Sequence, residues 1–124
     1  MKILALLITL LLILSHAYAG WMWVGKNDLG TYYVDFERIR KQDGYVYWWS
    51  LWDFPKPLLQ TTWSAKTYNQ GDCKLFRFKR LSYISYEKPM GRDVGKSNNP
   101  ENPEWNYPPP QSVDENFLKS VCNQ

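Results

Sequence analysis

The two cysteines of this 124-residue chain, Cys73 and Cys122, constrain its fold more than any other feature. In a domain exported to an oxidising compartment, an even pair of cysteines predicts a disulfide. The bond would close a loop of about 50 residues and stabilise the fold by roughly 4 kcal/mol in the chain-entropy treatment. Free thiols and a metal pair are the alternatives, although a metal site would need about four ligands and the chain has no further thiol.

The N-terminal residues 1–19 have the order of a secretory signal peptide. Lys2 supplies a positive charge, residues 3–14 form an apolar run, and a small-x-small site ends at Ala19. About twelve apolar residues are too few for the roughly 20 that a membrane-spanning helix needs. We therefore expect cleavage between Ala19 and Gly20, with an uncleaved membrane anchor as the alternative.

The chain that remains after this cleavage, residues 20–124, has the length of one domain. All seven tryptophans lie in it, and each buried aromatic side chain removes about 150–250 Å² from water, so aromatic residues must supply much of the core. Loss of Lys2 leaves 15 − 1 = 14 basic residues against 12 acidic ones. That excess is too small for a dedicated nucleic-acid-binding protein.

Short β-prone segments separated by turns make up most of this domain. Asp43-Gly44 is typical of a hairpin turn, and Pro55 is expected to end the strand before it. That strand is aromatic on both alternate faces, which predicts a central strand covered on each side. A bulge or bend somewhere near Arg77 to Arg80 would reconcile the mixed faces of the last strand. The expected strands are residues 21–24, 30–35, 36–41, 45–54, 61–68 and 74–86, with a turn at 69–72.

Residues 87–110 are rich in Gly, Pro and Asn and predict a loop, with a short pairing segment at 105–107. Ser112 and Glu115 then form a capping box at the start of a helix whose apolar stripe holds Val113, Phe117 and Val121, with Cys122 beside its end. The predicted fold class is α+β: a twisted antiparallel sheet of about five or six strands, one C-terminal helix packed on it, and one disulfide.

An ordered series of short motifs resembles the surface-adhesin protein E family. The motifs lie at residues 32–35, 49–54, 72–73, 81–83 and 105–122. The resemblance implies a small exported domain with a disulfide that ties a helix to an antiparallel sheet. It also implies that at least one relative binds host matrix and plasma proteins at the bacterial surface. Residues 87–91 depart from the family, which usually has a Gly-rich turn there.

Catalytic groups are scarce in the expected domain. His16, the only histidine, lies in the signal, and the carboxylates are scattered along turns. Asp53 is the best candidate for a perturbed acid, although a strand-end carboxylate bound to Lys56 or a turn amide is the simpler interpretation. No calcium-loop spacing or phosphate-binding loop is present, so we expect no enzyme, no metal and no cofactor.

Surface aromatic and basic side chains are the remaining functional signal. The predicted binding surface comprises Trp21, Trp48, Trp63, Trp105, Arg77, Lys79 and Arg80. The sequence therefore predicts an exported, non-enzymatic binding or adhesion module in the periplasm, at the outer surface or secreted. Its partner would be a host or envelope protein or a glycan, with no nucleic acid and no transmembrane anchor in the mature chain. A structural or assembly component of the envelope is the alternative function, and a hydrolase of envelope polymers ranks third.

Overall fold

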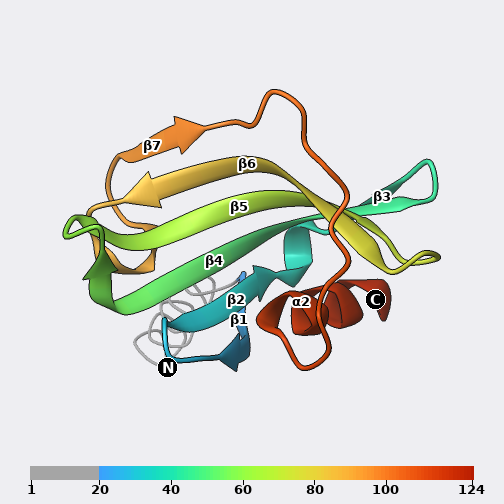
Figure 1. Ribbon diagram of the computed structural model, residues 1–124, viewed down its shortest axis with the longest axis horizontal. Helices are drawn as coiled ribbons and strands as arrows, with labels where there is room; N and C mark the ends of the chain where they lie inside the picture. The colour runs from blue at the N-terminus through green and yellow to red at the C-terminus, as the bar shows by residue number, and fades with distance from the viewer. Residues whose placement is uncertain (1–19) are drawn as a thin grey trace, which may run out of the picture.

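The computed structural model describes residues 20–124, which form one antiparallel sheet with a single α-helix (Figure 1). The predicted signal peptide, up to Ala19, lies outside the described residues. The strands run in the order β1-β2-β4-β5-β6-β7, and β3 pairs with the start of β4. The elements are β1 (Trp21–Lys26), β2 (Thr31–Asp35), β3 (Arg40–Gln42), β4 (Tyr45–Leu58), β5 (Thr62–Asp72), β6 (Arg77–Tyr86), β7 (Gly95–Asn98) and α2 (Val113–Cys122), with short 3-10 turns η1 (Phe36–Arg38) and η2 (Pro89–Gly91).

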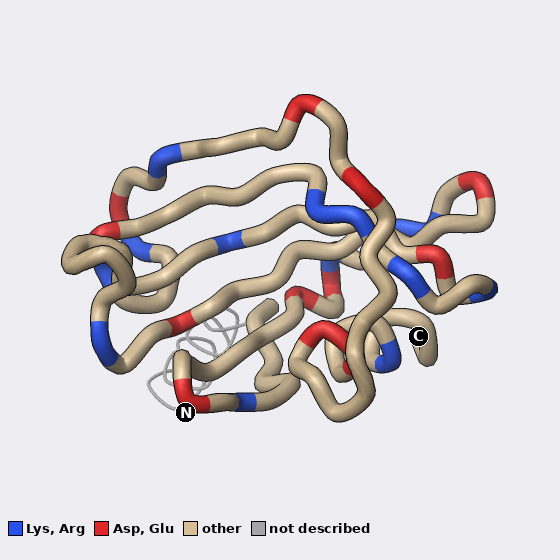
Figure 2. The backbone as a smooth tube through the Cα atoms, viewed as in Figure 1, with Lys and Arg blue, Asp and Glu red and all other residues tan. Residues whose placement is uncertain are grey.

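The helix packs across one side of the sheet, which we call the helix face. The core between them is largely aromatic and aliphatic, as the composition predicts. Its buried members are Tyr32, Val34, Val46, Trp48, Phe78, Phe117, Leu118 and Val121. Charged residues are sparse in the two longest strands: β4 carries Asp53 and Lys56, and β5 carries Lys66 and Asp72 (Figure 2).

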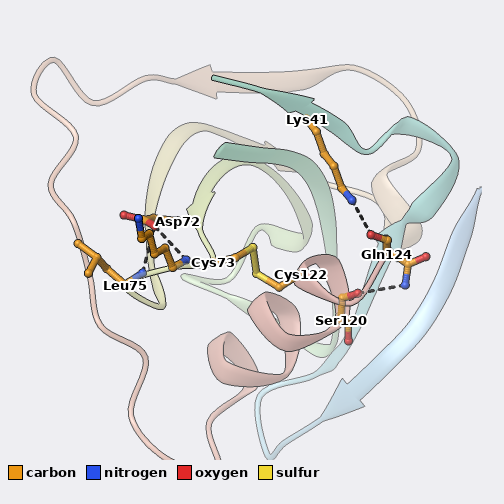
Figure 3. The surroundings of a disulfide bond; sticks show 8 residues. Lys41, Asp72, Cys73, Leu75, Ser120, Cys122 and Gln124 are labelled. Carbon is orange, nitrogen blue, oxygen red and sulfur yellow. Dashed lines mark hydrogen bonds between the residues drawn. A yellow bond between two sulfur atoms is a disulfide. The ribbon is translucent and has the colours of Figure 1, made fainter. Parts of the chain in front are cut away.

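The predicted disulfide and fold class are confirmed. Cys73 and Cys122 are bonded with their Cα atoms 5.7 Å apart and 49 positions apart in the sequence. Cys73 opens the turn after β5, and the Asp72 carboxylate shapes this turn by accepting the backbone N–H groups of Lys74 and Leu75, each at 3.1 Å (Figure 3). The bond therefore joins the last turn of α2 to the end of the sheet.

The helix begins at the predicted cap. Ser112 Oγ accepts the backbone N–H of Glu115 at 3.1 Å. The reciprocal contact of a capping box goes one residue further out, because Glu115 Oε1 accepts the N–H of Gln111 at 3.3 Å. The first bond satisfies one orphan donor of the helix start, and the second fixes the chain just before the cap.

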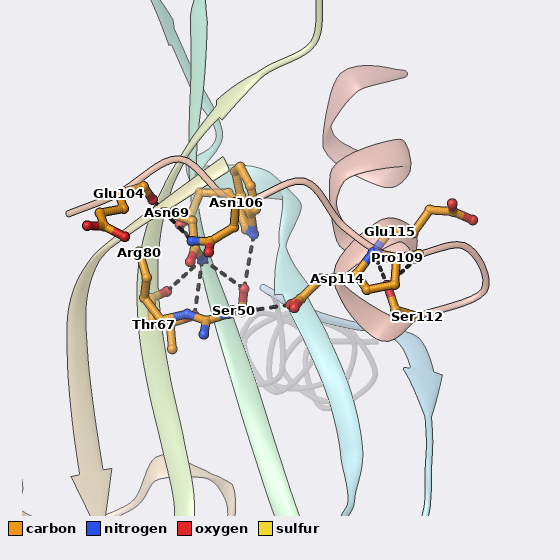
Figure 4. A network of polar contacts seen from close by, with 11 residues as sticks. Ser50, Thr67, Asn69, Arg80, Glu104, Asn106, Pro109, Ser112, Asp114 and Glu115 are labelled. Carbon is orange, nitrogen blue, oxygen red and sulfur yellow. Dashed lines mark hydrogen bonds and ion pairs between the residues drawn. The ribbon is translucent and has the colours of Figure 1, made fainter. Parts of the chain in front are cut away.

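A polar network crosses the middle of the helix face. The Asn69 side-chain amide donates to Ser50 Oγ and to Thr67 Oγ1, both at 3.1 Å, and Trp48 Nε1 donates to Ser50 Oγ at 3.0 Å (Figure 4). Asn69, Ser50 and Thr67 are all buried. Because buried polar groups are costly unless bonded, this network fixes the Trp48 ring and the alignment of β4 with β5.

The expected ends of β4 and β5 were wrong. Residues 69–72 belong to β5, and the turn lies at 73–76. Gly71 suits the strand because a Cβ there would come within 2.8 Å of the Trp48 ring. Strand β4 also continues past Pro55 to Leu58, since its ladder with β5 is interrupted between Asp53 and Leu58, where a missing N–H costs nothing.

The expected strand at 36–41 is replaced by the turn η1 followed by the short strand β3. Asp35 caps the turn by accepting the N–H of Glu37 at 3.2 Å. The predicted bulge lies at Leu81, one residue beyond the expected interval, because Tyr68 pairs with Ser82 and Asn69 with Arg80.

The long segment after β6 is more ordered than a loop. Its strand β7 pairs with residues 83–86 of β6 and makes the sheet seven-stranded. Further along, the predicted pairing at 105–107 is present as a bridge between Asn106 and Phe78, with backbone bonds of 2.8 and 2.9 Å. This segment therefore pairs with the free edge of β6 at both ends of the strand.

We expect replacement of both cysteines, Cys73→Ser with Cys122→Ser, to lower the free energy of unfolding by about 4 kcal/mol, within the 2–5 kcal/mol typical of small exported domains. The loss arises because the unfolded chain regains the freedom of a loop spanning 49 positions. Urea unfolding of the oxidised domain and of the double variant measures it. A difference below about 1 kcal/mol would show that the non-covalent core alone holds α2.

Candidate binding face

The side of the sheet opposite α2, which we call the outer face, carries a second set of aromatic side chains. Alternation along the strands and the observed register place them together. They are accompanied by three basic residues of strands β5 and β6 and by Ile84. The set comprises Tyr33, Tyr45, Tyr47, Trp49, Lys66, Tyr68, Arg77, Lys79, Ile84 and Tyr86, and all but the buried Tyr86 are partly accessible.

One end of the outer face is organised by Trp105. Its ring lies 4.2 Å from the Arg77 guanidinium carbon and 4.5 Å from Lys79 Nζ, and its centroid is 5.7 Å from that of Tyr45. The adjacent bridge of Asn106 to β6 holds the indole in place. We call these four residues, Trp105, Arg77, Lys79 and Tyr45, the Trp105 cluster. The charged groups of both cations lie over the ring, and both side chains stay partly accessible.

Asp72 fixes the position of Arg77. Its Oδ2 accepts Arg77 Nε at 3.0 Å, and its side chain is 9% exposed. The backbone N–H of Leu75, followed by Arg77 and the N–H of Lys74, lowers the pKa of Asp72, while partial burial acts in the opposite direction. The same carboxylate therefore shapes the disulfide turn and orients a cation of the Trp105 cluster.

A row of stacked rings continues across the centre of the outer face. The Tyr47 and Tyr68 rings stack at 6.1 Å, and the Trp49 and Tyr68 centroids are 4.9 Å apart. Arg40 lies over Tyr47 at 5.0 Å. Such pairs hold large contact areas in fixed positions at low cost in side-chain entropy.

Beyond this row lies a pocket of about 180 Å³. Lys66 Nζ lies 5.8 Å from the Trp21 ring centroid and 5.2 Å from that of Tyr86. Burial, and secondarily the charge of Arg38, lowers the pKa of Lys66. The lining residues are Trp21, Asp35, Arg38, Trp49, Lys66, Ile84 and Tyr86.

Three residues of the predicted surface do not belong to this face. Trp48 is only 2% exposed beneath α2, so its place in a binding surface is corrected. Arg80 also points to the helix face, where it pairs with Asp114 at 3.4 Å and lies 4.7 Å from the Trp52 ring. Burial lowers the pKa of Arg80. Trp63 lies two positions before Ala65, which pairs with Trp52 on the helix face. Because alternate residues of a strand lie on the same side of the sheet, Trp63 is on the helix face as well.

Trp21, Trp105, Arg77 and Lys79 are brought to the outer face, and their part in binding stays a prediction. Sequence reasoning missed the residues that join them, chiefly Lys66, Trp49 and Tyr68. The available signal was the aromatic content of alternate positions in residues 45–49. The expectation that both faces of this strand are covered was wrong within residues 20–124, where η2 covers only the Leu51 end of the outer face.

The simpler interpretation of Asp53, a carboxylate bound to a turn amide, accounts for its position. Its carboxylate accepts the backbone N–H of Met90 in η2 at 2.7 Å. In the part of the chain that the structure describes, no three His, Cys, Asp or Glu residues are grouped as metal ligands would be. Over the same residues, no helix has both the length and the apolar character needed to span a membrane.

A family model for the surface-adhesin protein E matches residues 21–123, which is most of the chain. The chain belongs to the surface-adhesin protein E family. The resemblance seen in the sequence is thereby confirmed, and the domain is a surface adhesion-type module. Family membership favours a non-enzymatic adhesin and is consistent with export.

Solved structures of protein E from Haemophilus influenzae have the same fold. One crystal form is 17% identical with a TM-score of 0.70, covering 85% of this chain and 88% of that one. Protein E from non-typeable H. influenzae is also 17% identical, with a TM-score of 0.66 and coverage of 85% and 76%. No curated protein matches the sequence.

Asp72→Asn should change the acid dependence of stability. Because the pKa of Asp72 is lower in the folded state, its contribution is full above the ordinary carboxylate pKa near 4 and disappears as pH falls through the folded-state pKa. The variant should be less stable than wild type at pH 7, and the difference should shrink towards pH 2. Thermal unfolding from pH 2 to 7 measures this.

Asp28→Asn is the matched control, since Asp28 is an exposed turn carboxylate with no ion pair among residues 20–124. A constant difference between Asp72→Asn and wild type over the whole pH range would contradict the role given to the Asp72 charge.

Proposed function

We propose that the domain is an exported adhesin that binds a protein partner through its outer face, after removal of residues 1–19. The observation that carries the proposal is the joined array of the Trp105 cluster, the stacked row and the Lys66 pocket on one side of the sheet. Aromatic and arginine side chains dominate the energetics of protein interfaces.

The composition of this face favours a protein over a glycan. The outer face combines apolar rings with accessible cations, whereas sugar sites commonly also use carboxylates to accept hydroxyl groups. The carboxylates nearest these rings, Asp72 and Asp35, already form ion pairs with Arg77 and Arg38. A partner surface with acidic residues around an apolar centre would complement it.

Lys79→Glu should weaken binding to a host matrix or plasma protein by about tenfold or more, because it reverses a charge within the Trp105 cluster. Surface plasmon resonance of the oxidised domain against a panel of purified matrix and plasma proteins measures this. Lys96→Glu on β7 is the matched control, since Lys96 pairs with Ser85 and has the parity of the helix face.

Equal loss in both variants would point to overall charge rather than to the outer face, and no loss in either would refute the assignment. If wild type binds none of these proteins, proximity labelling in cells tests the alternative role in the envelope. If the domain labels only envelope proteins and cannot be reached from outside the cell, an assembly role replaces adhesion.

The intact mass of the protein recovered from cells should correspond to a chain beginning at Gly20, with alkylation of Cys73 and Cys122 only after reduction. A mass that retains residues 1–19 would show an uncleaved anchor. Alkylation without prior reduction would show free thiols in the cellular protein.

A further inference from the structure

The pocket between β1, β4, β5 and β6 combines a half-buried lysine with aromatic walls. We propose that this pocket binds the carboxylate of an acidic side chain, Glu or Asp, from the protein partner. This inference rests on the proposed function and deepens it, because it names the chemistry by which the outer face selects its partner.

Lys66 is the central cation of the pocket. Within residues 20–124 no carboxylate lies within ion-pair distance of its amino group. The Trp21 and Tyr86 rings flank it, and its stem packs against the η2 turn, where a Cβ on Gly91 would come within 2.6 Å of Lys66 Cε. Lys66 is therefore held in position, and an incoming carboxylate would meet an oriented charge.

The other charged groups leave the pocket positive. Arg38 Nε contacts Asp35 at 3.4 Å, and the Arg38 side chain is 76% exposed. Asp35 is nearly saturated, because it also accepts the N–H of Glu37 and its side chain is only 9% exposed. The terminal amino groups of Arg38 have no bond within the described residues and can face a ligand.

The new N-terminus adds a further charge to the same place. Gly20 lies beside Asp35, since a Cβ built on it would be 3.5 Å from each atom of that carboxylate group. Removal of residues 1–19 places an α-ammonium group next to Asp35. The negative charge of Asp35 is then compensated by this group as well as by Arg38. Lys66 and Arg38 then face the pocket without a competing free carboxylate among the lining residues.

The pocket's size and walls suit one amino-acid side chain. A volume of about 180 Å³ accommodates the carboxylate and methylenes of Glu, which would pack against Trp49 and Ile84. Trp49 is shared with the stacked row through its contact with Tyr68. Residues flanking the acidic side chain would therefore continue onto an apolar surface, as at a protein interface.

The test is an NMR titration of the oxidised domain of residues 20–124 with the blocked peptide acetyl-Ala-Glu-Val-amide and with its Gln counterpart. The Glu peptide should shift the Lys66 side-chain signals and the Trp21 and Trp49 indole N–H signals saturably, and about tenfold more tightly than the Gln peptide. Lys66→Gln should abolish this preference. Lys96→Gln, on the opposite face, should retain it.

Equal affinity for the two peptides, or no saturable shift at the solubility limit, would overturn the proposal. If glucuronate shifts these signals and the Glu peptide does not, the pocket is a site for an acidic sugar and the protein ligand is rejected. The plasmon-resonance assay separates the two levels of inference. A Lys66→Gln domain that binds its matrix protein as wild type does leaves adhesion intact and refutes the pocket, whereas a wild type that binds the Glu peptide but no matrix or plasma protein refutes only adhesion.

Discussion

The covalent tie between Cys73 and Cys122 holds the last turn of α2 against the end of β5. The bond keeps the helix packed on the sheet, where Leu118 and Val121 are fully buried in one core with Trp48. A core of this size has little redundancy, so a restraint worth a few kcal/mol is a large share of the total stability. The helix that the bond holds covers one side of the sheet, and most aromatic side chains of the other side stay partly accessible.

The two faces divide the same kinds of side chain between different tasks. On the helix face, Trp48 donates a hydrogen bond within a buried network and Arg80 lies beneath Asp114. On the outer face, Trp49 stacks on Tyr68, and Arg77 lies over Trp105. Neighbouring residues in one strand thus alternate between the buried core and the accessible outer face, which is how a small domain can present a rigid surface.

Local patterns predicted much of the fold. The Ser112 cap, the bonded sulfurs and the bulge near the end of Arg77–Arg80 all follow from nearby residues or from composition. The binding face depends instead on strand register, which no local pattern states: a shift of one residue exchanges Trp48 with Trp49. The Lys66 pocket draws on segments from Trp21 to Tyr86, so only the assembled sheet brings its parts together.

Because α2 follows all the strands in the chain, formation of the disulfide is linked to completion of the fold. The helix follows all seven strands in the sequence, so a chain that emerges N-terminus first exposes Cys73 long before Cys122 arrives. Until then, the ring of Trp48 and the side chains of Val34 and Val46 lack the helical layer that buries them. Docking of the helix holds the two sulfurs within bonding reach, which a flexible loop spanning 49 positions reaches only at a cost in entropy. Oxidation therefore favours chains whose helix has docked, and chains that lack the bond remain open to the proteases and chaperones that clear exposed apolar surfaces.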